Sequence, residues 1–138
     1  MKATIAVLAL LAGCAAVGPQ PDRVVYHLSE GLPQASNGLR NIGNHLEVNP
    51  SARIVVVSHA RGVDFLMKDA KDANGNPFEV TVQDLVSKGV RFDACAFTLQ
   101  SRNLDPKTAL IEEAKIVPSG VAEVARLQAR EGYVYLKP

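Results

Sequence analysis

Two kinds of apolar pattern alternate along the chain. Short continuous apolar runs, rich in β-branched residues, are typical of strands that are buried on both faces of a parallel sheet. Between these runs, apolar residues recur at every third or fourth position, as in a helix that buries one face. The predicted strands are 24–28, 54–57, 90–97, 115–117 and 133–136. The predicted helices cover 35–46, 63–68, 82–86, 105–113 and 121–127.

Residues that start or stop helices support this division. Asn49-Pro50 ends the first helix, Gly89 and Gly132 stand where helices commonly end, and Asp105-Pro106 is a good helix start. Strands that alternate with helices predict an α/β fold: a three-layer sandwich with a mainly parallel five-stranded sheet. A flavodoxin-like strand order would place the first strand between the second and the third.

The N-terminus has the features of an export signal. Residues 1–13 contain a single cation, Lys2, and an apolar stretch that is too short to span a membrane. The motif Leu11-Ala12-Gly13-Cys14 resembles the bacterial lipobox, in which the leader is cut before a cysteine that becomes lipidated. An ordinary cleaved secretory signal is the alternative. Both interpretations predict export, and the first predicts a lipid anchor on Cys14 in a membrane.

The remaining chain divides simply into residues 14–22, a short Pro- and Gly-containing tether, and residues 23–138, a single domain. The sequence has 15 Lys and Arg against 14 Asp and Glu, and Lys2 belongs to the leader, so the exported part is neutral. A neutral chain without tryptophan argues against nucleic-acid binding. Neither a Gly-x-Gly-x-x-Gly motif nor a phosphate loop occurs, and no cofactor is predicted.

Cys95 is the main candidate for chemistry, because lipidation of Cys14 would leave it as the only free thiol. With no Cys-x-x-Cys motif, dithiol exchange within the chain is excluded. One interpretation is a small buried residue on an apolar strand. The other is a nucleophilic thiol served by the hydroxyls of Thr98 and Ser101 and by the cation of Arg102. A single thiol of this kind can carry sulfur as a persulfide.

Histidines follow two of the predicted strands. His59 is either a polar loop residue or a proton shuttle near neutral pH. His27, inside an apolar run, is typical of a core histidine with a satisfied hydrogen bond. These two histidines and Cys95 together have ligand types suited to zinc or copper, although they lack motif spacing. Ser119-Gly120 opens the last helix as a cap or, alternatively, as an anion-binding start.

Five segments, taken in their order and spacing, carry a family resemblance. They are VVYHL (24–28), NGLRNIGNHL (37–46), IVVVSH (54–59), GVRFDACAFTL (89–99) and IVPSGVAE (116–123). Together they resemble the DsrE/DsrF-like proteins across the whole domain. The resemblance implies a YchN-like α/β fold that is frequently assembled into trimers or hexamers. Some members are implicated in sulfur oxidation or sulfur relay, and Cys95 resembles the family cysteine that carries a persulfide.

The resulting hypothesis is a membrane-tethered, periplasm-facing sulfur carrier or thiol-binding protein that acts through Cys95, with His59 as a proton shuttle. It is a carrier more than an enzyme with its own turnover. Its partners would be sulfur donor and acceptor proteins or small thiols, further copies of the chain, and the membrane that holds the Cys14 lipid. Two alternatives stay open: a non-catalytic oligomeric module for a small ligand, and a Cys-His metal site at the carboxyl edge of the sheet.

Overall fold

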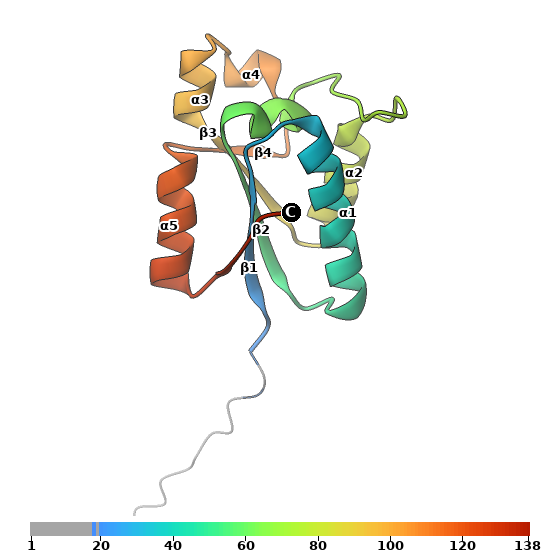
Figure 1. Ribbon diagram of the computed structural model, residues 1–138, viewed down its shortest axis with the longest axis vertical. Coiled ribbons are helices and arrows are strands. Elements are labelled where there is room, and N and C mark those ends of the chain that lie inside the picture. The colour runs from blue at the N-terminus through green and yellow to red at the C-terminus, as the bar shows by residue number, and fades with distance from the viewer. Residues whose placement is uncertain (1–17, 19) are drawn as a thin grey trace, which may run out of the picture.

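The computed structural model describes residue 18 and residues 20–138, which form one sheet with helices on both faces (Figure 1). The strands are β1 (Arg23–Leu28), β2 (Arg53–Ser58), β3 (Arg91–Cys95), β4 (Ala114–Val117) and β5 (Val134–Leu136). The helices are α1 (Leu32–Val48), the 3₁₀ helix η1 (Ala60–Leu66), α2 (Phe78–Ser87), α3 (Ala96–Ser101), α4 (Pro106–Ala109) and α5 (Gly120–Glu131). The predicted fold class, an α/β sandwich on a five-stranded sheet, is confirmed.

The sheet is parallel throughout, with the order β4-β3-β2-β1-β5. The flavodoxin-like order, with the first strand between the second and third, is therefore wrong: β2 lies between β1 and β3. The reason is the handedness of the crossovers. Because α1 and α2 lie on the same face, right-handed connections from β1 to β2 and from β2 to β3 step in one direction. Helix α5 lies on the other face, so its connection returns the chain to the far edge beside β1.

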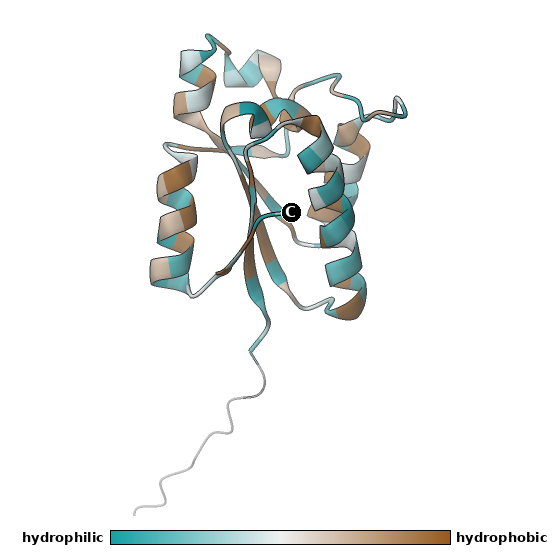
Figure 2. Cartoon of the chain, in the orientation of Figure 1, coloured by the Kyte–Doolittle hydropathy of each residue, from teal (hydrophilic) through white to brown (hydrophobic). Residues whose placement is uncertain are grey.

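The two faces of the sheet carry separate cores. Alternate residues of β1, such as Val24, Tyr26 and Leu28, pack with α1, η1 and α2 in the larger core. Val25 belongs to the opposite face and packs with Val55, Val57, Val124 and Leu127 beneath α5. Figure 2 shows this arrangement as hydrophobic residues in the central strands and polar residues along the outer sides of the helices. One amphipathic helix is thus enough to cover the second face.

Three predicted elements differ from the observed ones. The segment 63–68 is part of the 3₁₀ helix η1 rather than an α-helix. The strand predicted for 90–97 ends at Cys95, because Ala96 and Phe97 begin α3 and Phe97 is 64% exposed. The helix predicted for 105–113 stops at Ala109, where tertiary pairing takes over: the Ile111 amide donates to the carbonyl oxygen of Leu66.

The N-terminal predictions fall largely outside the described residues. The predicted signal peptide at 1–13, Cys14 and the first part of the predicted tether are among the positions that the structure does not describe. None of the helices in the described part of the chain combines the length and apolar character needed to cross a membrane.

Glycine 62 lets η1 approach the end of β1 closely. A Cβ atom at this position would lie 2.0 Å from the carbonyl oxygen of Leu28, a backbone atom that cannot move aside. We expect Gly62→Ala to lower the free energy of unfolding by about 3 kcal/mol or more, as measured by urea denaturation. Gly43→Ala is the control, since Gly43 is inside α1 with open space around it, and should raise that free energy by about 1 kcal/mol. Equal effects of the two substitutions would contradict this account of η1.

Candidate functional site

The carboxyl edge of the sheet brings together the three residues that sequence analysis selected. His27 is the penultimate residue of β1, His59 directly follows β2, and Cys95 is the last residue of β3. Side chains alternate between the two faces of a strand. His27 therefore shares the α5 face with Val25, and Cys95 shares it with Asp93. His59 continues the same alternation, because its backbone is extended and its amide donates to the carbonyl oxygen of Leu28.

Helix α5 begins directly over this edge, with Gly120 between His59 and Cys95. A Cβ atom on Gly120 would lie 3.1 Å from the Cβ of His59 and 3.3 Å from the Cβ of Cys95. A larger residue at this position would have to push these side chains aside by a few tenths of an ångström. Ser119 caps the helix as predicted, because its hydroxyl oxygen accepts a hydrogen bond from the Ala122 amide at 3.3 Å. The sequence signalled this cap, but not that the next residue would reach Cys95.

Salt bridges hold α5 in this position. Asp93 of β3 is 1% exposed, and the Arg91 guanidinium donates to it. The same guanidinium reaches Glu123 of α5 at 2.8 Å, and Glu123 also accepts from Arg126. The strand that carries Cys95 is thereby tied to the helix that carries Gly120.

Cys95 is buried at the N-terminus of α3, with the start of α5 packed against it. The residue is 5% exposed and is the free cysteine of the described chain. Burial raises the pKa of its thiol, but amides of Gly120, Thr98 and Phe97 and the Thr98 hydroxyl lower it more, so the pKa lies below its usual value. These donors stabilise the thiolate, which is the nucleophilic form of cysteine. The residue is thus buried, as the first interpretation expects, and its thiol pKa is lowered, as the second expects.

Of the residues predicted to assist the thiol, Thr98 is the one whose hydroxyl contributes to the lowered pKa of Cys95. Its oxygen also accepts the amide of Ala60 at 2.9 Å, which joins α3 to the start of η1. Ser101 and Arg102, the other two residues predicted to assist the thiol, form different interactions. Ser101 donates to the Thr98 carbonyl oxygen, and Arg102 forms an ion pair with Asp64 at 2.6 Å. The low pKa of Cys95 therefore comes from hydrogen bonds and not from a neighbouring cation.

The two histidines contact each other. His27 Nε2 lies 2.6 Å from His59 Nε2, and His27 Nδ1 lies 2.7 Å from the Tyr135 hydroxyl. Burial lowers the pKa of His59. Burial also lowers the pKa of His27, helped by His59 and Lys137 and opposed by Glu30. Lower pKa values make both rings mainly neutral at pH 7.

The metal alternative receives no support from this geometry. Within residues 18 and 20–138, no group of three or more His, Cys, Asp or Glu side chains is arranged to hold a metal ion. The Nε2 atoms of His27 and His59 face each other directly across a hydrogen bond. A zinc or copper site made from Cys95, His27 and His59 is thus not formed.

A surface groove of about 650 Å³ opens beside the site, in the size range of small-molecule pockets. Its lining residues come from η1 and α3 and the turns before them: His59, Ala60, Arg61, Asp64, Phe97, Thr98, Ser101 and Arg102. His59 and Thr98 thus reach both the thiol region and the groove. The groove is large enough for a small molecule or a segment of a partner protein to bind next to His59 and Thr98.

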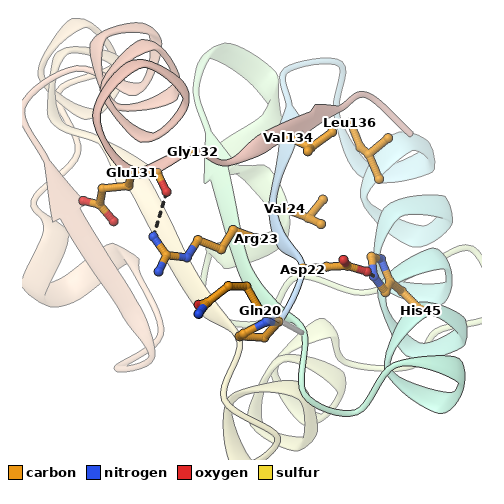
Figure 3. Close-up of a pocket in the computed structure, with 10 residues that line it drawn as sticks. Gln20, Asp22, Arg23, Val24, His45, Glu131, Gly132, Val134 and Leu136 are labelled. Carbon is orange, nitrogen blue, oxygen red and sulfur yellow. Dashed lines mark hydrogen bonds and ion pairs between the residues drawn. The ribbon is translucent and has the colours of Figure 1, made fainter. Parts of the chain in front are cut away.

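A second cavity, of about 480 Å³, lies at the opposite end of the strands (Figure 3). Arg23 at the start of β1 donates to the carbonyl oxygen of Glu131 at 2.9 Å, and His45 lies on the other side of the strand. Because this cavity surrounds the amino end of β1, it is separate from Cys95 and His59. We assign it no chemistry.

The comparisons with known proteins agree with one another. The family model described as the DsrE/DsrF-like family matches residues 23–138. A solved protein of unknown function from Methanobacterium thermoautotrophicum, MTH1491, is 32% identical, with a TM-score of 0.74 over 85% of this chain and 99% of its own. The YchN protein of E. coli has the same coverage, 14% identity and a TM-score of 0.70, which shows a shared fold alone. A search of curated proteins finds no significant match.

The hydroxyl of Thr98 can be tested as a donor to the Cys95 thiolate. A hydrogen bond to a charged group contributes about 1.5–3 kcal/mol, so we expect Thr98→Val to raise the pKa of Cys95 by about one unit. The rate of alkylation by iodoacetamide, measured against pH, reports this pKa. Thr98→Ser keeps the hydroxyl and should leave the pKa unchanged. A pKa that is the same in all three proteins would show that the hydroxyl does not contribute.

Proposed function

The chain belongs to the DsrE/DsrF-like family, and from this membership and the surroundings of Cys95 we propose that it is a sulfur carrier that holds sulfur as a persulfide on Cys95. The observations that support the proposal are the position of Cys95 at the N-terminus of α3 beside Gly120 of α5 and the lowered pKa of its thiol. They favour an anionic sulfur, both in the thiolate that attacks a donor and in the persulfide that results.

The proposed transfer needs no oxidant. The Cys95 thiolate attacks the terminal sulfur of a donor persulfide, R–S–SH, and a new bond forms from Cys95 Sγ to that sulfur. The R–S bond to the terminal sulfur breaks, and its electron pair leaves with the thiolate R–S⁻. His59 supplies the proton that converts this thiolate into R–SH. Delivery to an acceptor thiol is the same exchange in reverse, so the protein is a carrier between two partners.

The groove beside His59 and Thr98 is the proposed docking place for the donor and the acceptor. Small thiols fit its volume, and a protein partner would place only its sulfur-bearing segment there. We further propose that the chain forms a trimer or hexamer. The edge strand β5 supports this, because Val134 is 63% exposed and Leu136 is 39% exposed, and both side chains lie on the face of β5 opposite to Tyr135.

The proposed location is a periplasm-facing membrane surface, reached through the leader at 1–13 and a lipid on Cys14. The support is the short apolar leader followed by Leu-Ala-Gly-Cys. A tethered carrier of this kind would exchange sulfur with exported partners rather than with cytoplasmic ones. The tether at 14–22 would hold the domain next to the membrane.

Persulfide formation is tested by mass spectrometry of the intact protein after incubation with a small-molecule persulfide. We expect Cys14→Ser protein to gain one sulfur atom, which dithiothreitol removes, and Cys14→Ser/Cys95→Ser protein to gain none. Transfer of the sulfur to a second thiol would complete the carrier cycle. If Cys95 gains no sulfur while a small thiol binds the groove equally well with and without Cys95, the protein is the alternative, a non-catalytic ligand-binding module.

Lipidation of Cys14 is tested by expressing the full chain in a bacterium supplied with labelled palmitate. We expect the wild-type chain to take up the label and to sediment with membranes, and Cys14→Ser to lose both properties. Cys95→Ser is the matched control, since it removes the other cysteine and should stay labelled. A wild-type chain that is cleaved but free of label would instead support the ordinary secretory signal.

A further inference from the structure

Polar side chains form a row across four neighbouring strands at the carboxyl edge, on the face covered by α5. In the order β5, β1, β2, β3, the row consists of Tyr135, His27, His59 and Cys95. The register places Tyr135 beside Val25 and His27 beside Val57, and these two valines belong to the core under α5. The row therefore continues one face of the sheet from an open edge to the thiol. Tyr135 is the member that no sequence pattern indicated.

Hydrogen bonds connect the first three members without a gap. The Tyr135 hydroxyl lies 2.7 Å from His27 Nδ1, and His27 Nε2 lies 2.6 Å from His59 Nε2. Both nitrogens of His27 are thus engaged. His59 Nδ1 has no hydrogen-bond partner among the described residues, which leaves it as the nitrogen of the row that can act on another molecule. Tyr135, at 38% exposure, is open to solvent at the other end.

Two neutral imidazoles that face each other through Nε2 share one proton, and this fixes how the others are arranged. In the first state, Tyr135 donates to His27 Nδ1, His27 Nε2 donates to His59 Nε2, and His59 Nδ1 carries a proton. In the second state, every bond is reversed: His59 Nε2 donates to His27, His27 Nδ1 donates to the Tyr135 oxygen, and His59 Nδ1 is an acceptor. The hydrogen bonds of the row can therefore reverse direction only all together.

We propose that Tyr135 and His27 are positioning residues that set the protonation of His59 and renew its proton from solvent during sulfur transfer. This inference rests on the proposed function. When His59 Nδ1 gives its proton to the leaving thiolate R–S⁻, the His27 Nε2 proton passes to His59 Nε2 and the Tyr135 proton passes to His27 Nδ1. Water then returns a proton to the Tyr135 oxygen. One proton enters from solvent and one leaves on R–SH, and the row is left in the second state. Proton uptake by His59 Nδ1 from water and proton release from Tyr135 to water then return the row to the first state before the next transfer.

The charges around the row favour the passage of one proton at a time. Glu30 and Lys137 form an ion pair next to His27, and their effects on its pKa oppose each other. His59 is the other titratable neighbour of His27, and a second proton on the pair would place two N–H groups face to face. The row therefore passes one proton at a time and does not store two. A relay of neutral groups requires this property.

The relay is tested first without any sulfur chemistry, by nitrogen-15 NMR of the histidine rings in the full chain. We expect Tyr135→Phe to shift the ring nitrogens of both His27 and His59, because the hydroxyl that orders them is lost. Tyr26→Phe is the matched control: Tyr26 contacts His45 at 3.2 Å in the other core, so this substitution should shift His45 alone. Unchanged His59 nitrogens in Tyr135→Phe would overturn the inference.

The second test is the rate at which Cys95 takes up sulfur from a small-molecule persulfide, measured against pH. We expect Tyr135→Phe and His27→Gln each to slow the transfer by about tenfold near pH 7 and to move the pH at which the rate changes. Alkylation of Cys95 by iodoacetamide, which needs no proton from His59, should proceed at the wild-type rate in both variants. A slower transfer with an unchanged pH profile would mean that the two residues only support the fold, and would also overturn the inference.

These tests separate the relay from the proposed function. If Cys95 accepts no persulfide but the NMR shifts appear as expected, the sulfur carrier is wrong while the coupled row stands. If Cys95 accepts sulfur and Tyr135→Phe behaves as the wild type in both measurements, the carrier stands and the relay is wrong.

Discussion

The site depends on one close approach, the entry of α5 between His59 and Cys95 at Gly120. A side chain there would press on the Cβ atoms of both residues, at 3.1 and 3.3 Å. Because Gly120 has none, α5 begins against Cys95, and the Gly120 amide contributes to the lowered pKa of the thiol. The ion pairs from Arg91 to Asp93 and Glu123 keep the helix on the strand that carries the thiol. This contact therefore affects the packing of α5, the ion pairs that hold the helix and the surroundings of the Cys95 thiol.

The same approach explains why the two faces of the sheet differ. The face under α1, η1 and α2 is mostly apolar, with the buried Ser58 at the end of β2, whereas the face under α5 has a small valine and leucine core that gives way to polar side chains at the carboxyl edge. A single helix covers this face, so the ends of the strands are left for His27 and Cys95. In open parallel sheets this edge is where ligands bind.

Much of the fold could be predicted from the sequence, because its signals are local. β-branched runs, helical spacing and the glycines at 89 and 132 mark most elements within a few residues. The prediction failed where tertiary contacts overrode the local pattern. Phe97 was predicted to lie in a strand but lies in α3. Ile111 was predicted to lie in a helix, but its amide donates to the carbonyl oxygen of Leu66. The strand order also failed, since it follows from the face on which each connecting helix lies and no short pattern encodes that.

By itself, the sequence determined the fold class and the identity of the reactive candidates, since Cys95, His59 and His27 stand at the ends of predicted strands and parallel strands end at one edge. Only the tertiary structure decided which groups act on the thiol. Backbone amides of α3 and α5, rather than Ser101 and Arg102, lower the pKa of the thiol. Tyr135 lies beside His27. These contacts join residues far apart in the chain, through a strand order and a helix position that are set by packing rather than by local propensity.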